Sequence, residues 1–268
     1  MPTVRCPPTR RLLLGAAMLA GLLPPGRAQE PALRITSSES QGELQGQVQA
    51  VSPFSFEAVR EALSRPAVWC EILMLHLNNK SCRLEQGAGG PAIALAIARK
   101  HDQTVQQAHL LQLQWRLQES SAQRIAVRLD AADGPFGTTD YVVLLTAQPD
   151  GPGRTAIAFS YACRFSRASR LALRTYLSTL GRDKVGFTTE DGGARLVGGL
   201  RGVVERTAMR YYLAIDAWLQ AATLPAGERA VARLERWFDA TERYPRQLHE
   251  LDKAEYLTNK RRELGLAP

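Results

Sequence analysis

Six short segments between residues 72 and 165 have the character of β-strands and are separated by groups of turn-forming residues. They are Ile72–Glu85, Ala92–Lys100, Leu110–Gln118, Ile125–Asp130, Tyr141–Gln148 and Thr155–Phe165. The breaks, such as 86–91, 133–137 and 149–153, are rich in Gly, Pro, Ser and Asp, which turn the chain. Because such short links favour antiparallel pairing, the sequence predicts an antiparallel sheet.

The strand segments are apolar at alternate positions, which places the apolar side chains on one face. These residues are Leu111, Leu113, Trp115 and Leu117 in one segment and Ile157, Phe159 and Tyr161 in another. Glutamine, arginine and small residues occupy the positions between them. A period of two of this kind predicts a sheet with one face in the core and one in water.

Helical segments flank the predicted sheet. Ser55–Ser64 follows a possible strand at Gln45–Val51, has Ser55 as a possible N-cap, and is expected to stop before Pro66. Further helices are expected over Arg167–Leu180 and Gly199–Ala222. The last of these has an apolar stripe of Leu200, Val204, Thr207, Tyr211, Ala214, Ile215 and Trp218. Its opposite side, with Arg201, Glu205, Asp216 and Gln220, is expected to face water.

The first 28 residues have the pattern of an export signal. Arginines precede the apolar segment Leu12–Leu23, and a small-x-small pattern ends at Ala28, so residues 1–28 are expected to be removed and Gln29 to begin the mature chain. Thr9–Leu14 also resembles a twin-arginine motif, which leaves the export route open between Sec and twin-arginine. The protein is thus expected to be periplasmic or secreted, and residues 29–44 are expected to be a flexible lead-in.

Charge and hydropathy exclude two other classes of protein. Four arginines in the signal segment account for half of the formal net charge of +8, and basic and acidic residues are interspersed elsewhere. Nucleic-acid binders concentrate Lys and Arg on one face, so no nucleic-acid partner is expected. No apolar run reaches the roughly 18 residues of a membrane-spanning helix, so the mature chain is expected to have no transmembrane segment.

Three cysteines remain after the expected cleavage. Cys70 and Cys82 are close in sequence and are the candidate disulfide pair, which requires the chain to bend between them, and Cys163 is the expected remainder. The sequence alone leaves open which cysteines pair. No CxxC or HxxxH spacing occurs, so no metal site is expected.

The element order resembles the START-like (SRPBCC, Bet v 1-like) superfamily, whose members have the helix-grip fold. The resemblance covers residues 45–222 and also rests on Pro53–Val59 leading into Pro66–Trp69, and on Gly198–Arg206 at the start of the last helix. It implies an α+β fold in which a curved antiparallel sheet of about seven strands surrounds a long C-terminal helix. The helix at Arg167–Leu180 and a helical extension over residues 223–268 depart from the usual plan.

The resemblance also implies an apolar cavity that takes a lipid or another hydrophobic small molecule. The candidate ligand-binding residues are Trp115, Tyr141, Phe159, Tyr161, Thr207, Arg210 and Tyr211. Pockets of this type are mainly apolar with a few polar groups that fix the ligand's orientation. For any one of these aromatic residues an ordinary core position is the favoured interpretation, and the ligand-binding hypothesis rests on the set.

No catalytic motif accompanies these residues. The histidines lie in separate segments, and Glu205 falls on the polar side of its helix, where an exposed ion pair is expected. The leading hypothesis is a periplasmic, non-catalytic carrier of a hydrophobic small molecule or lipid that needs no cofactor. One alternative is a START-like cyclase, hydratase or hydrolase that uses Glu205, His76 or Arg210. The other is an envelope protein-interaction module with a filled cavity, whose charged tail from Pro225 to Pro268 contacts a partner.

Overall fold

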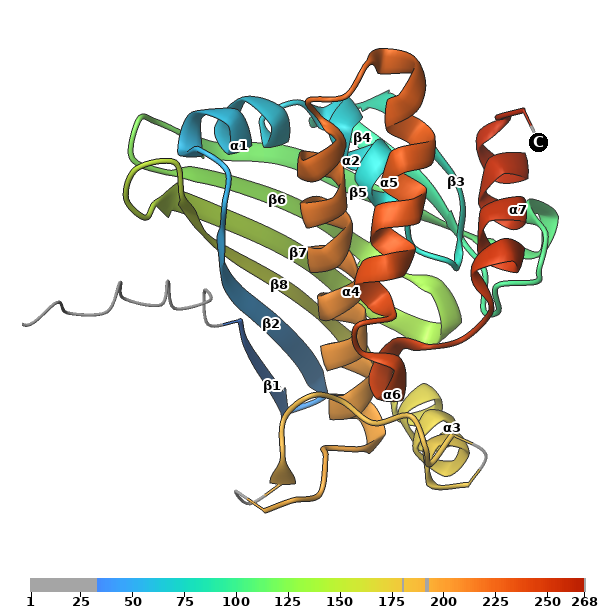
Figure 1. Ribbon diagram of the computed structural model, residues 1–268. Helices are drawn as coiled ribbons and strands as arrows, with labels where there is room; N and C mark the ends of the chain where they lie inside the picture. Colours follow the sequence, from blue (N-terminus) through green and yellow to red (C-terminus); the bar gives the residue numbers. More distant parts are fainter. Residues whose placement is uncertain (1–32, 180, 191–192, 268) are drawn as a thin grey trace, which may run out of the picture. The chain divides into compact units, whose positions relative to one another are not determined.

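A curved sheet of eight antiparallel strands is the scaffold of the structure, a computed structural model that describes residues 33–179, 181–190 and 193–267 (Figure 1). The strands are β1 (Arg34–Ser40), β2 (Glu43–Ser52), β3 (Asn79–Gly87), β4 (Gly90–Ile97), β5 (His109–Ser120), β6 (Ile125–Asp133), β7 (Thr138–Pro149) and β8 (Thr155–Phe165). Their order in the sheet is β1-β2-β8-β7-β6-β5-β4-β3. The signal segment predicted at residues 1–28 lies outside the described residues.

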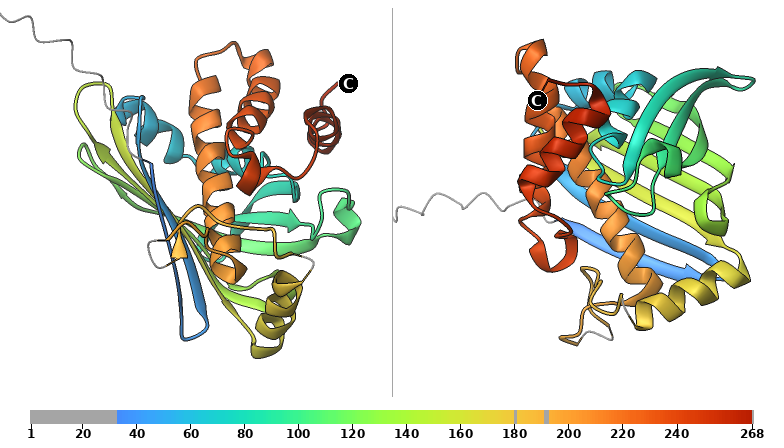
Figure 2. Two further views of the ribbon diagram at one scale, coloured as in Figure 1. Left: turned by 60° about the horizontal axis from the view of Figure 1, so that its bottom comes forward. Right: turned by 90° about the vertical axis from the view of Figure 1, so that its right-hand side faces the viewer.

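The long helix α4 (Gly199–Ala221) lies in the angle of the sheet, which bends around it (Figure 2). The helix approaches β2 most closely at Gly46, where a Cβ atom would lie 2.8 Å from the carbonyl oxygen of Val204. Only glycine permits this approach of helix backbone to strand. The helix-grip architecture that the sequence predicts is therefore confirmed, with α4 held against one end of the sheet.

The eighth strand is β1, which lies inside the predicted flexible lead-in at residues 29–44. That prediction is wrong for Arg34–Ser40, which pairs antiparallel with β2 through a tight turn at Gln41 and Gly42, both with positive φ. The strand was difficult to recognise because Ile35 is its one apolar residue and the rest of its side chains are polar. An edge strand buries little, so its sequence carries a weak apolar alternation.

Two short helices connect β2 to β3. Helix α1 (Phe56–Leu63) has Ser55 as its N-cap, as predicted, with the Ser55 hydroxyl accepting a hydrogen bond from the Ala58 amide. Pro66 begins the helix α2 (Pro66–Leu73) instead of only ending α1, and the strand predicted from Ile72 begins at Asn79. A short apolar run does not distinguish a buried helix from a strand, which explains this error.

The disulfide Cys70–Cys82 links α2 to β3 and confirms the candidate pair. The helix and the turn after it bring the two Cα atoms to 5.3 Å from each other. Cys163 is a buried free thiol, and burial raises its pKa to about 12. The remaining cysteine is therefore a protonated core residue.

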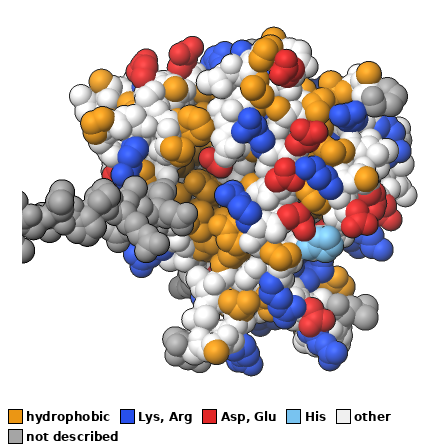
Figure 3. All heavy atoms as spheres, viewed as in Figure 1, with side chains coloured by type: hydrophobic (Ala, Val, Ile, Leu, Met, Phe, Trp, Pro, Cys, Tyr) orange, Lys and Arg blue, Asp and Glu red, His pale blue; other side chains and the backbone are white. Residues whose placement is uncertain are grey.

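The C-terminal extension is helical and packs on α4. It contains α5 (Ala226–Thr241), α6 (Pro245–Leu248) and α7 (Lys253–Leu264). The indole nitrogen of Trp237 donates to the carbonyl oxygen of Arg210 at 3.0 Å, and the hydroxyl of Tyr256 donates to the carbonyl oxygen of Leu75 at 2.8 Å. Figure 3 shows acidic and basic side chains interspersed over the outer face of this region.

The side of α4 that was expected to face water is partly covered by β1, by the loop before α4 and by the C-terminal extension. Glu205 is buried and Arg201, Asp216 and Gln220 are half-buried, so the prediction that these four residues face water is wrong. A helical wheel shows which side of α4 is polar. It does not show that polar groups from other parts of the chain pack against that side.

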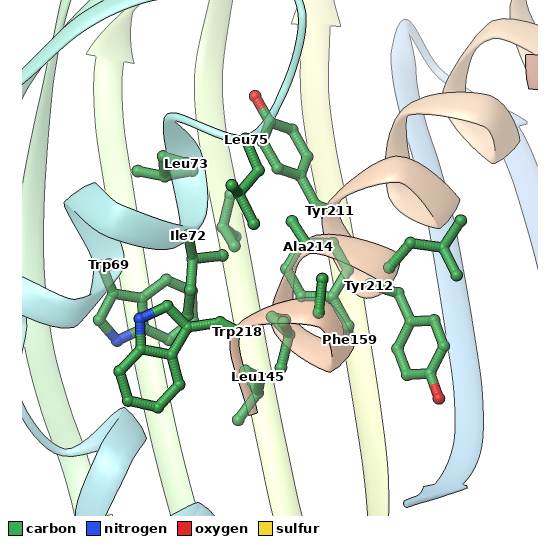
Figure 4. Close-up of a cluster of buried hydrophobic side chains, with 14 of the residues drawn as sticks. Trp69, Ile72, Leu73, Leu75, Leu145, Phe159, Tyr211, Tyr212, Ala214 and Trp218 are labelled. Atoms are coloured by element: carbon green, nitrogen blue, oxygen red, sulfur yellow. The ribbon is translucent and has the colours of Figure 1, made fainter. Parts of the chain in front are cut away.

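The core lies between α2, the inner face of the sheet and α4. Figure 4 shows Trp69 and Ile72 of α2 beside Trp218 of α4, with Leu145 and Phe159 on the strands below them. This part of the interior is filled by the protein's own side chains. Among the described residues, no helix has the length and apolar character needed to cross a bilayer.

Candidate ligand-binding site

The strand register places most of the predicted aromatic residues on the face that meets α4. Trp115 lies opposite Leu129 of β6, Leu129 opposite Val143 of β7, and Val143 opposite Tyr161 of β8. Phe159 lies two residues along the same face of β8. The alternation predicted from the sequence thus holds, except that Leu117 is substantially exposed near the end of β5.

Three tyrosines meet at one end of this inner face, and we call Tyr141, Tyr161 and Tyr211 the tyrosine cluster. The ring centroids of Tyr141 and Tyr161 are 5.8 Å apart, and those of Tyr161 and Tyr211 are 6.4 Å apart. Phe159 joins the group, with its ring centroid 6.2 Å from that of Tyr211. The structure therefore brings together four of the seven residues predicted to bind a ligand.

Polar partners fix the hydroxyl groups of Tyr141 and Tyr211. The Tyr141 hydroxyl lies 2.7 Å from the Thr138 hydroxyl, and the Tyr211 hydroxyl accepts a hydrogen bond from the Asn79 side-chain amide at 3.3 Å. Tyr141 and Tyr211 are buried, whereas Tyr161 is half-buried. The cluster therefore reaches from the core toward the surface at Tyr161.

Burial keeps the cluster uncharged at neutral pH. It raises the pKa of Tyr141 to about 12 and raises the pKa values of Tyr161 and Tyr211 as well. The ordinary pKa of tyrosine is about 10, so none of the three is a phenolate near pH 7. The cluster can donate and accept hydrogen bonds, and it offers no anionic nucleophile.

Two polar atoms near the inner face are buried without a hydrogen-bond partner among the described residues. They are the indole nitrogen of Trp115 and the side-chain oxygen of Asn79. An unpaired buried polar group costs about 1–3 kcal/mol. The indole N–H is a donor only, so its natural complement is an acceptor oxygen.

Thr207 and Arg210 make their hydrogen bonds outside the tyrosine cluster. The Thr207 hydroxyl donates to the carbonyl oxygen of Val203, and Thr207 is half-buried. Arg210 points toward the C-terminal extension, where it donates to the carbonyl oxygen of Leu248 and to the carboxylate of Glu250. Arg210 thus holds the extension against α4.

Glu205 is a buried structural carboxylate, which corrects the expectation of an exposed ion pair. It accepts hydrogen bonds from the Ser37 hydroxyl and from the Phe187 amide, and from both the amide and the hydroxyl of Thr188. These donors come from β1 and from the loop after α3 (Arg167–Ser178). Glu205 therefore ties both to α4, and its acceptor sites are in use.

His76 lies against the tyrosine cluster and is neutral. Its ring stacks on Tyr211 with the centroids 5.1 Å apart, and its Nδ1 accepts a hydrogen bond from the Asn78 amide. Burial lowers its pKa well below the ordinary value of 6.5, and the positive charge of Arg210 lowers it further. Of the three groups considered for catalysis, His76 is the one that touches the cluster. No group of three potential metal-ligating side chains occurs in the described part of the chain.

Sequence reasoning missed three residues that shape the site. Asn79 and Thr138 supply the polar partners described above, and neither stands out in a single sequence. Gly134 lies directly beneath the ring of Tyr141, where a Cβ atom would come within 2.0 Å of the ring. The Asp133–Gly137 turn was recognised from its composition, but the contact of its glycine with Tyr141 was not.

The chain is similar to several proteins of known structure. No family model matches the sequence, and no curated protein sequence matches it. A structure of norcoclaurine synthase from Thalictrum flavum is 15% identical, with a TM-score of 0.34, covering 65% of this chain and 91% of that one. The Zhui aromatase/cyclase from Streptomyces sp. R1128 is 12% identical, with a TM-score of 0.37, covering 75% and 94%. Human StAR-related lipid transfer protein 5 is 9% identical, with a TM-score of 0.32, covering 50% and 73%.

The assignment of a helix-grip α+β fold rests on this chain's own topology, in which the antiparallel sheet surrounds the long α4. The sheet has eight strands, whereas about seven were predicted, and the additional strand is β1.

Proposed function

We propose that this protein is a periplasmic, non-catalytic carrier of a hydrophobic small molecule or lipid. The observation that carries the proposal is the tyrosine cluster, a set of uncharged hydroxyl groups set into an apolar wall between the sheet and α4. A site of this kind holds an apolar molecule by burial and orients it through a few hydrogen bonds.

The polar groups specify the chemistry of the ligand. The indole N–H of Trp115 is an unpaired donor, and the tyrosine hydroxyls are neutral donors. A carbonyl, ester or hydroxyl oxygen on an otherwise apolar molecule complements these groups, whereas a free cation finds no counter-charge in the cluster. The ligand class is therefore a weakly polar lipid or polyketide-like molecule.

The filled region beside α2 limits where the ligand lies. Trp69, Ile72 and Leu75 occupy the space between α2 and α4, and the disulfide ties α2 to β3. The half-buried residues Tyr161 and Thr207 lie toward the other end of α4. The ligand is accordingly assigned to the Tyr161 end, with its polar group toward Tyr141 and Trp115.

Export is the part of the proposal that rests on residues 1–28. The Cys70–Cys82 disulfide supports it, since such bonds persist in oxidising compartments and are rare in the cytosol. Mass spectrometry of the purified mature protein tests this step, because cleavage after Ala28 leaves Gln29 at the N-terminus.

Native mass spectrometry of the protein purified from the periplasm tests ligand binding. The expected result is a second species heavier by the mass of one lipid-like molecule, which organic solvent extracts. The Tyr161→Phe variant should retain less of it, and Tyr176→Phe, which alters an exposed tyrosine on α3, should retain as much as the unmodified protein. A protein that is empty and also fails to bind a hydrophobic dye contradicts the proposal.

A further inference from the structure

Helix α3 is attached to the rest of the structure by a narrow strip of its surface. Leu177 is its one buried residue, and Leu173 packs partly against the small apolar cluster of Leu44, Leu200 and Val204. The opposite side of the helix is open to solvent and includes Leu171, which is 69% exposed, and Tyr176, which is 42% exposed. A large apolar side chain so fully in water is unfavourable unless something covers it.

The same helix is basic. Its sequence contains Arg167, Arg170 and Arg174 and no acidic residue. The carboxylate of Glu39 lies 2.6 Å from Arg174 and 4.0 Å from Arg170, so one acid pairs with two of the three arginines. The neighbouring Arg164 pairs with Glu43 and Asp140 and adds no free charge.

A surface groove runs between α3 and the turn that joins β1 to β2. Its lining residues are Gln41, Gly42, Phe165, Arg167, Arg170, Leu171 and Arg174. Apolar side chains and guanidinium groups thus share one groove. This combination matches a phospholipid, whose phosphate pairs with arginine while its glycerol and acyl portions contact apolar side chains.

We propose that α3 and its groove dock the protein onto an anionic phospholipid membrane. Leu171 enters the boundary between headgroups and acyl chains, and Arg167 and Arg170 contact lipid phosphates. A basic amphipathic helix whose apolar side faces away from its own protein lies in the membrane interface in this way. Nucleic acid is disfavoured because it offers no apolar surface to Leu171.

Helix α3 lies beside the candidate ligand-binding site, but membrane docking does not depend on that site. Leu173 and the half-buried Tyr161 belong to the same apolar cluster, so the docking helix lies beside the end of the site that reaches the surface. Membrane docking goes beyond the proposed carrier function. Vesicle binding is measured on the protein with or without a bound ligand, so either proposal can fail while the other holds.

Vesicle flotation of the whole mature protein tests the proposal. The protein should float with vesicles of phosphatidylcholine and phosphatidylglycerol at low salt, bind weakly to phosphatidylcholine alone, and dissociate as salt increases. Arg167→Gln should lower the partition coefficient by about fivefold, the effect of one basic residue near an anionic surface. Leu171→Asp should abolish flotation, because it places a carboxylate where an apolar side chain enters the bilayer.

Matched variants on another surface provide the controls. Arg83→Gln and Leu110→Asp alter an exposed arginine on β3 and an exposed leucine on β5, and both should bind vesicles as the unmodified protein does. Circular dichroism should show all four variants folded. Absence of binding to anionic vesicles at low salt overturns the proposal, as does equal binding by Leu171→Asp. Release by inorganic phosphate at low ionic strength also overturns it, because the groove would then bind a free anion and not a membrane.

Discussion

Single residues determine whether the tyrosine cluster can form. Gly134 provides the space in which the ring of Tyr141 lies, and Gly46 provides the space through which α4 passes over β2. Neither glycine contributes a functional group. Both act by lacking a side chain where another part of the molecule must approach.

Gly134→Ala should destabilise the protein by about 2 kcal/mol, because an added methyl group must displace the buried ring of Tyr141. Urea denaturation measures the change in the free energy of unfolding. Gly227→Ala is the control, since a Cβ atom at that position of α5 meets no neighbour and alanine favours a helix. Equal stability of the Gly134→Ala variant and the unmodified protein would contradict the described position of Tyr141.

Glu250, in the C-terminal extension, neutralises a cluster of basic side chains. It pairs with Arg206, Arg210 and Lys184, and the first two of these are buried. Glu250→Gln should therefore cost about 3 kcal/mol, the lower end of the range for removing one partner from a buried ion pair. Thermal and urea denaturation measure the loss, and Glu61→Gln, at an exposed position of α1, should leave stability unchanged.

The carboxylate of Glu250 also makes the free energy of unfolding depend on pH in the acid range. Burial alone raises the pKa of Glu250, but the charges of Arg210, Arg206 and Lys184 outweigh burial and lower the pKa below its ordinary value of 4.5. Its contribution is therefore complete above that ordinary value and is lost as the pH falls through the lowered one. Denaturation midpoints measured between neutral and acid pH should fall less steeply for Glu250→Gln than for the unmodified protein. Parallel curves would show that Glu250 is not coupled to these cations.

At the scale of elements, the strands were the most predictable part of the chain. β8 was predicted with its observed bounds, because Ile157 and Phe159 alternate with small or polar residues and a turn rich in glycine and proline precedes the strand. α2 was misread because its residues are apolar apart from Glu71. β1 was missed because its residues are nearly all polar. Local pattern identifies an element only when one of its faces differs from the other.

The disulfide should stabilise α2 against β3. It closes a short loop, with a sequence separation of 12, for which chain entropy predicts a contribution of about 3 kcal/mol. Denaturation of the paired Cys70→Ala, Cys82→Ala variant should show that loss. Cys163→Ala is the control, because it removes a buried cysteine side chain and keeps the disulfide. A double variant as stable as the oxidised protein would mean that α2 is held by packing alone.

At the scale of the whole molecule, the C-terminal extension belongs to the fold. It supplies Trp237 and Tyr256 to the core and Glu250 to the buried arginines of α4. The helix-prone composition of residues 223–268 was visible in the sequence. Its contact surface was not, because charged residues on α4 resemble a solvated face until their partners are located.

A chain that ends at Ala222 should fail to fold cooperatively. Removing the extension exposes apolar surface on α4 and leaves Arg206 and Arg210 without Glu250. Near-ultraviolet circular dichroism and solubility measure this outcome. A soluble truncated protein with a sharp unfolding transition would instead make the extension an independent appendage, as the interaction hypothesis requires.

The candidate site was partly predictable for a related reason. Tyr141, Phe159, Tyr161 and Tyr211 follow from apolar alternation in strands and from the stripe of a helix. Asn79 and Thr138 are single polar residues whose roles depend on long-range contacts. Periodicity places a side chain on a face, but only the folded chain shows which hydroxyl meets which amide.

The indole N–H resonances of the four tryptophans test the central claim most directly. Trp69 and Trp237 donate to backbone carbonyl oxygens and Trp218 to Glu71, whereas Trp115 has no partner among the described residues. In nitrogen–proton correlation spectra recorded while a fatty acid and then a sterol are added, binding should move the Trp115 signal downfield and leave the other three nearly unchanged. A Trp115 signal that no lipid moves, or that moves no more than the other three, would contradict a ligand site on the inner face of the sheet.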